Sequence, residues 1–246
     1  MHLKPFKTLC KTSNSLYTFV EDGEKFLVKC YCKPAPEPKR TRESFMLDHW
    51  IELGFNVPKI VTKKIECIKA PYLVTSFIEG PSLREYLLGN SYPLEEKFEL
   101  LTRFFQEMAY RHKISINSND PDIAHHDPST DNVILAENRF YFIDFETPRK
   151  KRSVIELASI EIATICRWIV RDLGIDYVQE VLKRMVAVYK GQDNLLKPIV
   201  KRTSGRPFQF YHRWQDERKK VANPKDVTKY DIADGLAELS TDSGLR

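Results

Sequence analysis

Glycine is scarce in this chain, and long uninterrupted hydrophobic runs are absent. Only 9 of the 246 residues are glycine, which excludes a collagen-like repeat. No stretch of about 18 apolar residues, the length that crosses a bilayer, is free of charge. The most apolar candidate, Val154–Val170, carries Glu156, Glu161 and Arg167, so it predicts a buried helix. The N-terminal sequence lacks the apolar core of a signal peptide, and we therefore expect no transmembrane segment and a cytoplasmic location.

Cysteine is also scarce, and its pattern argues against two kinds of site. The five cysteines are odd in number and scattered, and no pair has the spacing of a zinc knuckle or a redox motif. The pattern is typical of reduced thiols, which fits a cytosolic protein.

The composition is that of an ordinary globular protein, but its charge is unevenly placed. Hydrophobic residues make up 42% and charged residues 30%, in a chain long enough for one large domain or two lobes sharing a cleft. The net charge is +5, yet the segment 197–220 alone holds eight basic and two acidic side chains, and Arg149–Arg152 is a second basic run. Such runs are often merely solvated surface. The functional alternative is attraction to phosphate, nucleic acid or an acidic membrane face.

The order of the expected elements predicts an α+β, bilobal chain. Apolar runs at Leu16–Val20 and Lys25–Tyr31 flank a turn that contains Gly23, which predicts a hairpin. After this hairpin we expect a proline-rich bend at 33–38 and a helix from 41 or 42 to 53. The other expected elements are a strand at Leu73–Phe77, a hinge at Glu79–Pro81, helices at Ser82–Leu88 and Leu94–His112, and mainly helix after 154. We therefore expect a small β-rich lobe with one helix at 1–78, a helical lobe at 79–225 and a loosely held tail at 226–246, with an active site between the lobes.

The stretch from His125 to Glu146 carries the chemistry. Val133–Leu135 and Phe140–Ile143 read as strands separated by a polar turn, and position 138 is the midpoint between Asn132 and Asp144. An antiparallel hairpin would therefore place Asn132 and Asp144 side by side, with Asp127 on the preceding loop within reach. Two carboxylates and an amide oxygen suit Mg²⁺, with one carboxylate left as a base or orienting group.

Chance alone explains part of this pattern but not all of it. An Asp and an Asn five positions apart occur often, because both residues commonly cap turns and end strands. The added histidine two residues before Asp127, and the Ile-Asp-Phe sequence twelve residues after Asn132, favour an active site.

These residues resemble a known family. His125-x-Asp127-x₄-Asn132 followed by Ile143-Asp144-Phe145 is similar to the catalytic loop and metal-binding motif of the protein-kinase-like fold. Upstream, Phe26–Lys29 resembles the strand with the phosphate-binding lysine, Arg42-Glu43 opens the helix where the paired glutamate belongs, and Leu73–Gly80 resembles the adenine-binding hinge. The resemblance covers roughly residues 10 to 170.

The resemblance implies an ATP- and Mg²⁺-dependent kinase, with a nucleotide-binding lobe followed by a catalytic lobe. Lys29 and Glu43 would hold the ATP phosphates, and Asn132 and Asp144 would bind Mg²⁺. Asp127 would orient the acceptor hydroxyl and take its proton. The remaining implied site residues are His125, which braces the loop, Ser76 and Ile78, which contact adenine through backbone groups, and Ser13 and Asn14, which cover the phosphates. Singly, Lys29 reads as a solvated strand lysine, Glu43 as a first-turn helix acid and His125 as a structural histidine.

Several positions depart from the family pattern. The segment Thr12–Ser15 has no glycine where the phosphate-covering loop should carry several, and Glu146 replaces the final glycine of Asp-Phe-Gly. Ser129 stands where protein serine/threonine kinases have a lysine, and no Ala-Pro-Glu segment follows. The chain is therefore not a regulated signalling kinase of the usual kind.

The resemblance is greatest to the small atypical members. One group is the bacterial kinases of lipopolysaccharide core sugars (Kdo and heptose kinases), and another is the small kinase-like ATPase of the tRNA-modifying KEOPS complex. The segment Phe45–Trp50 and the acidic residue after Ile-Asp-Phe slightly favour the first group. Aminoglycoside- and choline-type kinases share the same core. The acceptor hydroxyl, whether of a sugar, a lipid, a small molecule or a protein, stays open, as does an acidic inner membrane face as a peripheral contact.

Two alternatives compete with the active-kinase hypothesis. One is a pseudokinase or scaffold that binds nucleotide without transferring phosphate, which the missing glycines and Glu146 favour. The other is slow ATP hydrolysis within a complex. In that case the basic segment 197–220 would contact RNA through its aromatic side chains Phe208, Phe210, Tyr211 and Trp214.

Overall fold

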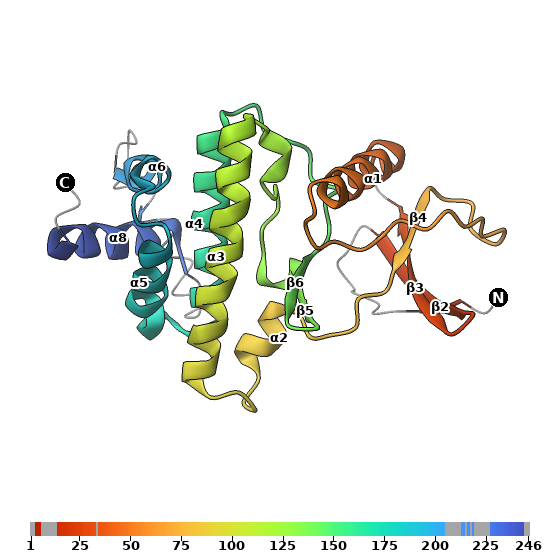
Figure 1. The fold of residues 1–246 in the computed structure, drawn as a ribbon, viewed down its shortest axis with the longest axis horizontal. Helices are drawn as coiled ribbons and strands as arrows, with labels where there is room; N and C mark the ends of the chain where they lie inside the picture. The colour runs from red at the N-terminus through yellow and green to blue at the C-terminus, as the bar shows by residue number, and fades with distance from the viewer. Residues whose placement is uncertain are drawn as a thin grey trace. The chain divides into compact units, whose positions relative to one another are not determined.

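The computed structural model describes residues 3–5, 14–32, 34–204, 213, 214, 216, 218 and 227–243. The chain divides into two compact units (Figure 1). The first combines Met1–Pro81 with Asn132–Arg149, and the second combines Ser82–Asp131 with Lys150–Arg246. The expected α+β class is confirmed, because the first unit contains a small antiparallel sheet and the second is helical. The division differs from the expected lobes, since the chain returns to the first unit after residue 131.

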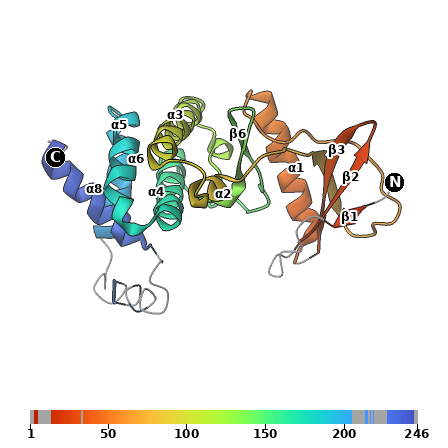
Figure 2. The same ribbon diagram turned by 90° about the horizontal axis from the view of Figure 1, so that it is seen from below.

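The first unit is built on a four-stranded antiparallel sheet in the order β1-β2-β3-β4 (Figure 2). The strands are β1 (Lys4–Pro5), β2 (Asn14–Glu21), β3 (Glu24–Tyr31) and β4 (Tyr72–Ser76). A two-residue turn joins β2 to β3. Its central residues Asp22 and Gly23 have φ of 52° and 81°, the left-handed conformation that matches the twist of a hairpin. This turn sets Lys29 opposite Leu16 on one side, and β4 sets it opposite Leu73 on the other.

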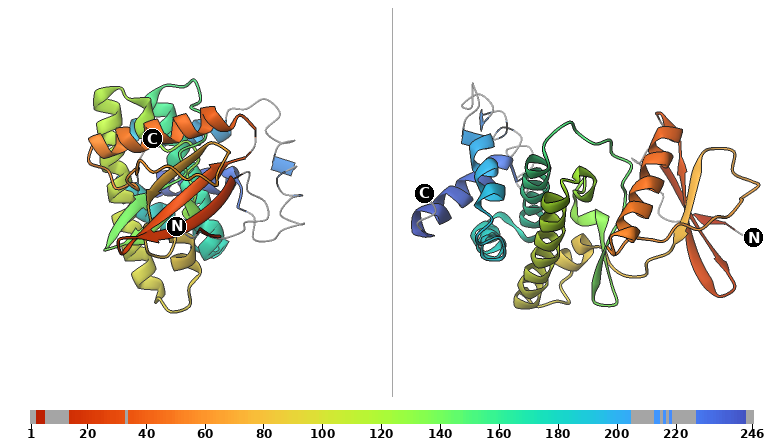
Figure 3. Two further views of the ribbon diagram at one scale, coloured as in Figure 1. Left: turned by 90° about the vertical axis from the view of Figure 1, so that its right-hand side faces the viewer. Right: turned by 45° about the horizontal axis from the view of Figure 1, so that its top comes forward.

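Helix α1 (Pro36–Glu52) packs against β3 and β4 of this sheet (Figure 3). It begins about five residues before the expected start at 41 or 42, because proline is accepted in the first helical turn, where its missing N–H would have no partner. The prolines that predicted a bend therefore lie at the start of the helix. As a result Glu43 lies well inside α1 rather than at its opening.

Two groups of apolar side chains hold the first unit together. One is a cluster on the sheet formed by Phe19, Val28, Cys30, Ile65 and Val74. The other centres on Trp50 of α1, which is fully buried and packs against the rings of Phe55, Phe142 and Phe145 at centroid distances of 5.4, 5.4 and 4.8 Å. The second group ties α1 to the segment that carries Asp144.

The hairpin of β5 (Val133–Ala136) and β6 (Arg139–Phe142) also belongs to the first unit. The N–H of Leu135 donates to Pro81 O at 2.9 Å, and the N–H of Phe142 donates to Asn56 O at 3.0 Å. Gly80 is required at this crossing, because a Cβ atom there would lie 1.9 Å from Leu135 O. These contacts explain why the hairpin packs with the first 81 residues.

The turn of this hairpin corrects the register expected from the sequence. Glu137 and Asn138 have φ of 49° and 63°, so the turn has two residues and its centre lies between them. Val133 is consequently paired with Phe142, and the N–H of Ile143 donates to Asn132 O at 3.0 Å. Asn132 is therefore opposite Ile143, and Asp144 lies one residue further along the chain.

The second unit consists of helices (Figure 1). Serine residues cap two of them, because Ser82 and Ser153 each form a reciprocal capping box with the glutamate three residues on. The α-helices are α2 (Leu83–Leu88), α3 (Leu94–Ser118), α4 (Val154–Leu173), α5 (Val178–Val188), α6 (Asp193–Ser204) and α8 (Lys229–Ser243). The 3₁₀ helices are η1 (Pro121–Ile123), η2 (Thr130–Asn132), which ends at the unit boundary, and η3 (Ile175–Tyr177). Within the described part of the chain, no helix is long and apolar enough to span a bilayer.

Helix α8 corrects the expectation of a loosely held tail. It packs against α5 and α6, and it buries Tyr230, Ile232 and Leu236. Gly235 allows this contact, since a Cβ atom there would lie 2.6 Å from a methyl carbon of Leu182 on α5. Residues 229–243 are therefore part of the helical unit.

Candidate active site

Lys29 is the centre of a charged cluster in the first unit. It projects from β3, and its side chain is only 12% exposed. Its Nζ atom lies 2.7 Å from Glu43 Oε2, 2.5 Å from Asp144 Oδ1 and 3.2 Å from Glu146 Oε2. One ammonium group is thus surrounded by carboxylates from α1 and from the segment after β6.

Glu43 reaches the cluster from the buried face of α1. Its side chain is 7% exposed, and Oε2 accepts hydrogen bonds from Lys29 Nζ and from the hydroxyl of Tyr31, both at 2.7 Å. Lys29 and Tyr31 are two positions apart on β3, so their side chains point to the same side of the sheet. The structure therefore brings together the lysine and glutamate that the sequence pattern selected.

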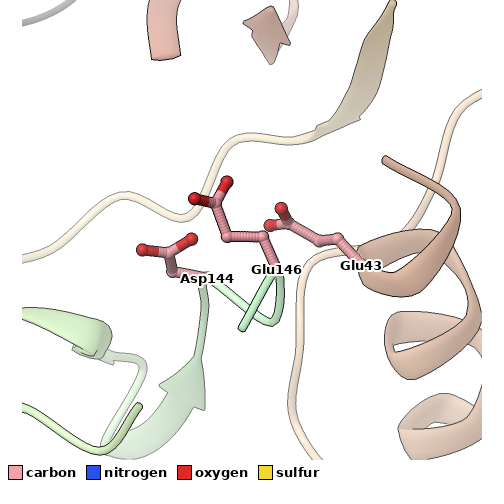
Figure 4. A group of neighbouring side chains, drawn as sticks. All are labelled: Glu43, Asp144 and Glu146. Atoms are coloured by element: carbon pink, nitrogen blue, oxygen red, sulfur yellow. The ribbon is translucent and has the colours of Figure 1, made fainter. Parts of the chain in front are cut away.

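Asp144 and Glu146 flank a buried aromatic anchor. Phe145 is 3% exposed and packs on Trp50, whereas the carboxylates of its two neighbours gather near that of Glu43 (Figure 4). Asp144 has φ of 67°, a left-handed conformation that costs a non-glycine residue about 1–3 kcal/mol. Anchoring of the next residue holds Asp144 in this conformation.

Glu146 is a member of the cluster that sequence reasoning did not select. Its Oε1 lies 3.1 Å from Lys39 Nζ on α1, and its Oε2 accepts from Asn14 Nδ2 at 2.5 Å as well as lying near Lys29. In the sequence it stood out only as an acidic replacement of an expected glycine. The signal in the sequence was its position two residues after Asp144, because a buried Phe145 between them places both carboxylates on the same side of the segment.

The charges of the cluster determine the state of Lys29. Burial acts to lower the pKa of the Lys29 ammonium, but the carboxylates of Glu43, Asp144 and Glu146 outweigh burial and hold its pKa above the ordinary value. Lys29 therefore carries a full positive charge at physiological pH, which is the state that binds phosphate.

The same carboxylates also offer oxygen ligands of the kind that bind a divalent metal ion. One oxygen from each of Glu43, Asp144 and Glu146 lies within 4.8 Å of the others, and carboxylate oxygens are the ligands that Mg²⁺ prefers. Asn132 was expected beside Asp144 as a ligand. Its backbone oxygen accepts from the N–H of Ile143 in the hairpin register described above.

The residues expected to contact the nucleotide are placed as follows. Asn14 begins β2, and its side chain donates to Glu146. The N–H of Ser76 donates to Lys59 O at 2.8 Å, so this donor is already used within the first unit. Ile78 follows β4 by two residues and is half-buried, and Ser13 lies outside the described residues.

The second unit carries the loop with His125 and Asp127. His125 is buried, and its Nδ1 accepts from the N–H of Asp127 at 3.2 Å. The flanking residues Pro128, Ser129 and Thr130 are also buried, whereas Asp127 is exposed. The loop therefore presents one carboxylate to solvent from an otherwise packed backbone.

A buried ionic network holds the start of this loop. The N–H of His125 donates to Glu161 Oε2 at 2.8 Å. Glu161 on α4 also pairs with Arg111 at 2.6 Å and with His112 Nε2 at 3.1 Å, both from α3, and His112 Nδ1 lies 2.8 Å from the hydroxyl of Tyr189. All five residues of the network are almost fully buried.

A second set of contacts holds the end of the loop. The hydroxyl of Thr130 donates to Asp172 Oδ2 at 2.5 Å, and Arg84 pairs with Asp131 at 2.9 Å and with Asp172 at 3.7 Å. These contacts fix residues 130 and 131 to α2 and α4. The loop is thus held on both sides of Asp127.

The structure describes all of the basic run Arg149–Arg152 but only part of the basic segment 197–220. Arg149, Lys150, Lys151 and Arg152 are all exposed. In the segment 197–220, Trp214 is 45% exposed, whereas Phe208, Phe210 and Tyr211 lie outside the described residues.

Comparisons with known proteins agree with this architecture. No family model matches the chain. Its sequence is 32% identical over 104 residues to the KEOPS complex subunit Bud32 of Pyrococcus abyssi (strain GE5 / Orsay), a match that covers 42% of this chain. The matched region spans less than half of that relative, also 42% of its length.

A solved structure resembles most of the chain. It is that of WaaP in complex with acyl carrier protein, with a TM-score of 0.51 and 13% sequence identity, covering 80% of this chain and 86% of the other. Together with the sequence match, this likeness shows an atypical protein-kinase-like fold.

Proposed function

We propose that this protein is a phosphotransferase that moves the γ-phosphate of ATP to a hydroxyl group. The observation that carries the proposal is the contact of Lys29 with both Glu43 and Asp144 inside one unit of a kinase-like fold. In such folds the phosphates are bound by a strand lysine that pairs with a helix glutamate, together with the metal-binding aspartate that follows the catalytic loop.

The first unit supplies the nucleotide site. Lys29 provides a fixed positive charge for the phosphate oxygens, and Glu43, itself held by Tyr31, positions that charge. Asp144 would hold Mg²⁺ together with Asn132, the second ligand expected from the sequence. The metal would supply charge neutralisation on the phosphates.

The second unit supplies the carboxylate that acts on the acceptor hydroxyl. Asp127 is exposed, and its carboxylate would orient an acceptor hydroxyl and take its proton. His125 and Glu161 hold the backbone of this loop and do not themselves contact the reacting groups. Most of the rate enhancement then comes from alignment and from charge neutralisation.

The acceptor is an anionic sugar or lipid in this proposal. The exposed basic run Arg149–Arg152 follows Asp144 closely in the sequence and carries four positive side chains. Such a run favours a substrate that bears carboxylate or phosphate groups, for example a lipopolysaccharide-type sugar, and a peripheral contact with an acidic membrane face. A cytoplasmic location, where ATP is available, is part of the proposal.

A second candidate is a nucleotide-binding subunit that transfers no phosphate or hydrolyses ATP slowly within a complex. One observation favours it, namely that Glu146 also lies near Lys29 and adds negative charge where phosphate would bind. The match to a protein named as a KEOPS complex subunit points to the same class. RNA would then be the partner of the basic segment 197–220.

A labelled-ATP assay separates the two candidates. The full-length protein is incubated with γ-phosphate-labelled ATP and Mg²⁺, first alone and then with a lipid and lipopolysaccharide extract, a protein extract or total tRNA. The phosphotransferase proposal predicts label in the lipid and lipopolysaccharide fraction, and none there when Asp127→Ala replaces the wild type.

The other outcomes are equally clear. Label in the protein fraction alone would replace the proposed acceptor by a protein hydroxyl. Release of free labelled phosphate, stimulated by tRNA and without any labelled acceptor, would support the second candidate. Absence of ATP binding by the folded protein would contradict both.

A further inference from the structure

We propose that the carboxylate of Glu146 occupies a phosphate-binding position and competes with nucleotide phosphates for it. This inference rests on the proposed function, since it concerns how the same cluster takes up a nucleoside di- or triphosphate. It assigns Glu146 a role in setting nucleotide affinity.

Three hydrogen-bond donors from different elements surround the carboxylate of Glu146. Its two oxygens are contacted by Lys29 Nζ at 3.2 Å, Lys39 Nζ at 3.1 Å and Asn14 Nδ2 at 2.5 Å. Two ammonium groups and an amide N–H, from β3, α1 and the start of β2, converge on one anion. This is the donor set that binds a phosphoryl group, and a carboxylate is the side-chain anion that resembles it most.

The number of donors on Lys29 limits how many anions can bind it. An ammonium group has three N–H donors, and three carboxylates already surround Lys29. A phosphate oxygen can therefore bind Lys29 closely only by displacing one of them. Glu43 is buried and also held by Tyr31, and Asp144 has the shortest contact, at 2.5 Å. Glu146 has the longest contact with Lys29 and is the group to be displaced.

Displacement of Glu146 also releases the other donors that contact it. Movement of Glu146 away from Lys29 also frees the side chains of Asn14 and Lys39 from that carboxylate. Asn14 lies at the end of the segment Thr12–Ser15 that the sequence pattern places over the phosphates. A nucleotide that displaces Glu146 therefore gains donors that the carboxylate had been using, which offsets part of the cost of displacement.

Nucleotide binding measured by calorimetry tests this inference. The probes are adenosine, ADP and ATP, each with and without Mg²⁺, on wild type, Glu146→Gln, Glu146→Ala and the control Glu66→Gln. Glu66 is an exposed acid of the same unit, so its variant makes the same change in net charge. Glu146→Gln keeps the size of the side chain, and melting curves establish that each variant is folded.

Competition predicts a dependence on phosphate. Both Glu146 variants should bind ADP and ATP about tenfold more tightly than wild type, the ratio that corresponds to one charge-assisted hydrogen bond. Their affinity for adenosine should be unchanged, and Glu66→Gln should behave as wild type.

Three results would overturn the inference, and they separate it from the proposed function. Unchanged affinity of the Glu146 variants for ADP and ATP would remove the competition while leaving a nucleotide site. Weaker binding only in the presence of Mg²⁺ would make Glu146 a metal ligand instead. No binding of any probe by folded wild type and variants would contradict the proposed function itself, and the inference with it.

Discussion

The hydroxyl of Tyr31 donates a hydrogen bond to Oε2 of Glu43 at 2.7 Å, the same oxygen that Lys29 contacts. Tyr31 is fully buried and lies two residues after Lys29 on β3. Glu43 is therefore held by a neutral donor as well as by an ammonium group. This second contact keeps the carboxylate in place when Lys29 turns toward a phosphate.

Replacement of Tyr31 by phenylalanine should weaken both stability and nucleotide binding. The variant loses one hydrogen bond to a buried carboxylate, which we expect to lower the free energy of unfolding by about 1.5–3 kcal/mol. Glu43 is then positioned by Lys29 alone, so the affinity for ATP should fall severalfold. Urea unfolding and calorimetric titration measure the two effects.

The control for this variant is Tyr110→Phe, because Tyr110 is 62% exposed. Its unfolding free energy should change by less than about 0.5 kcal/mol. Wild-type stability and affinity in Tyr31→Phe would show that the Tyr31 hydroxyl does not support Glu43.

Phe145 should be needed both for the fold of the first unit and for the position of Asp144. Phe145→Ala removes a ring that packs 4.8 Å from Trp50, centroid to centroid, and should cost about 3–5 kcal/mol of unfolding free energy. Phe145→Leu fills part of the space and should cost less. We expect the affinity for ATP to fall more in the alanine variant, because the backbone of Asp144 loses its anchor.

The two Phe145 variants are compared by urea unfolding and by ATP titration at a temperature where both are folded. A large loss of stability with unchanged ATP affinity would show that Asp144 is positioned independently of Phe145.

The buried network on α3 and α4 should make the protein less stable in acid. Burial lowers the pKa of His112 below its ordinary value, so the imidazole is neutral at pH 7 in the folded protein. Burial opposes ionisation of Glu161, but Arg111 and His112 outweigh it and hold the pKa of Glu161 well below its usual range. Both groups bind protons more readily in the unfolded chain than in the folded protein, so acid favours unfolding. The free energy of unfolding therefore falls below about pH 6.5 because of His112, and below about pH 4.5 because of Glu161.

Urea unfolding followed by circular dichroism between pH 7.5 and pH 5 measures this effect. His112 should contribute a slope of up to about 1.4 kcal/mol per pH unit below pH 6.5, which His112→Gln should remove. His49→Gln, in the other unit, is the matched control and should keep the wild-type slope. An unfolding free energy that does not change over this range would contradict a neutral buried His112.

Much of the fold could be predicted from local patterns. The hairpin of β2 and β3 follows from short apolar runs and from Asp-Gly, and α3 follows from its apolar stripe. The start of α1 was missed because the prolines at 36 and 38 were read as a bend, although a first turn accepts them. The packing of α8 was missed because Gly235 weakens the helical pattern, and its close contact with Leu182 is visible only in three dimensions.

The residues of the candidate site could be predicted where they lie in motifs that follow one another in the order typical of the family. Lys29, Glu43 and Asp144 were chosen for that reason, and the structure brings them together. Glu146 was not, because its partners Lys39 and Asn14 are 107 and 132 residues away in the sequence. The predicted pairing of Asn132 with Asp144 was wrong by one residue. The prediction centred the turn on position 138, whereas the turn consists of two residues, Glu137 and Asn138, and its centre lies between them.

The most direct test of the account measures phosphate transfer and ATP binding on the same preparations of wild type, Asp127→Ala and Asp176→Ala. Asp176 is an exposed acid of the same unit and is the control. The account predicts that wild type and Asp176→Ala transfer labelled phosphate to an acceptor. Asp127→Ala should bind ATP as wild type does but transfer at least about 100-fold more slowly. Normal turnover by Asp127→Ala would contradict the role of Asp127, and the absence of any labelled acceptor with ATP-bound wild type would contradict the phosphotransferase.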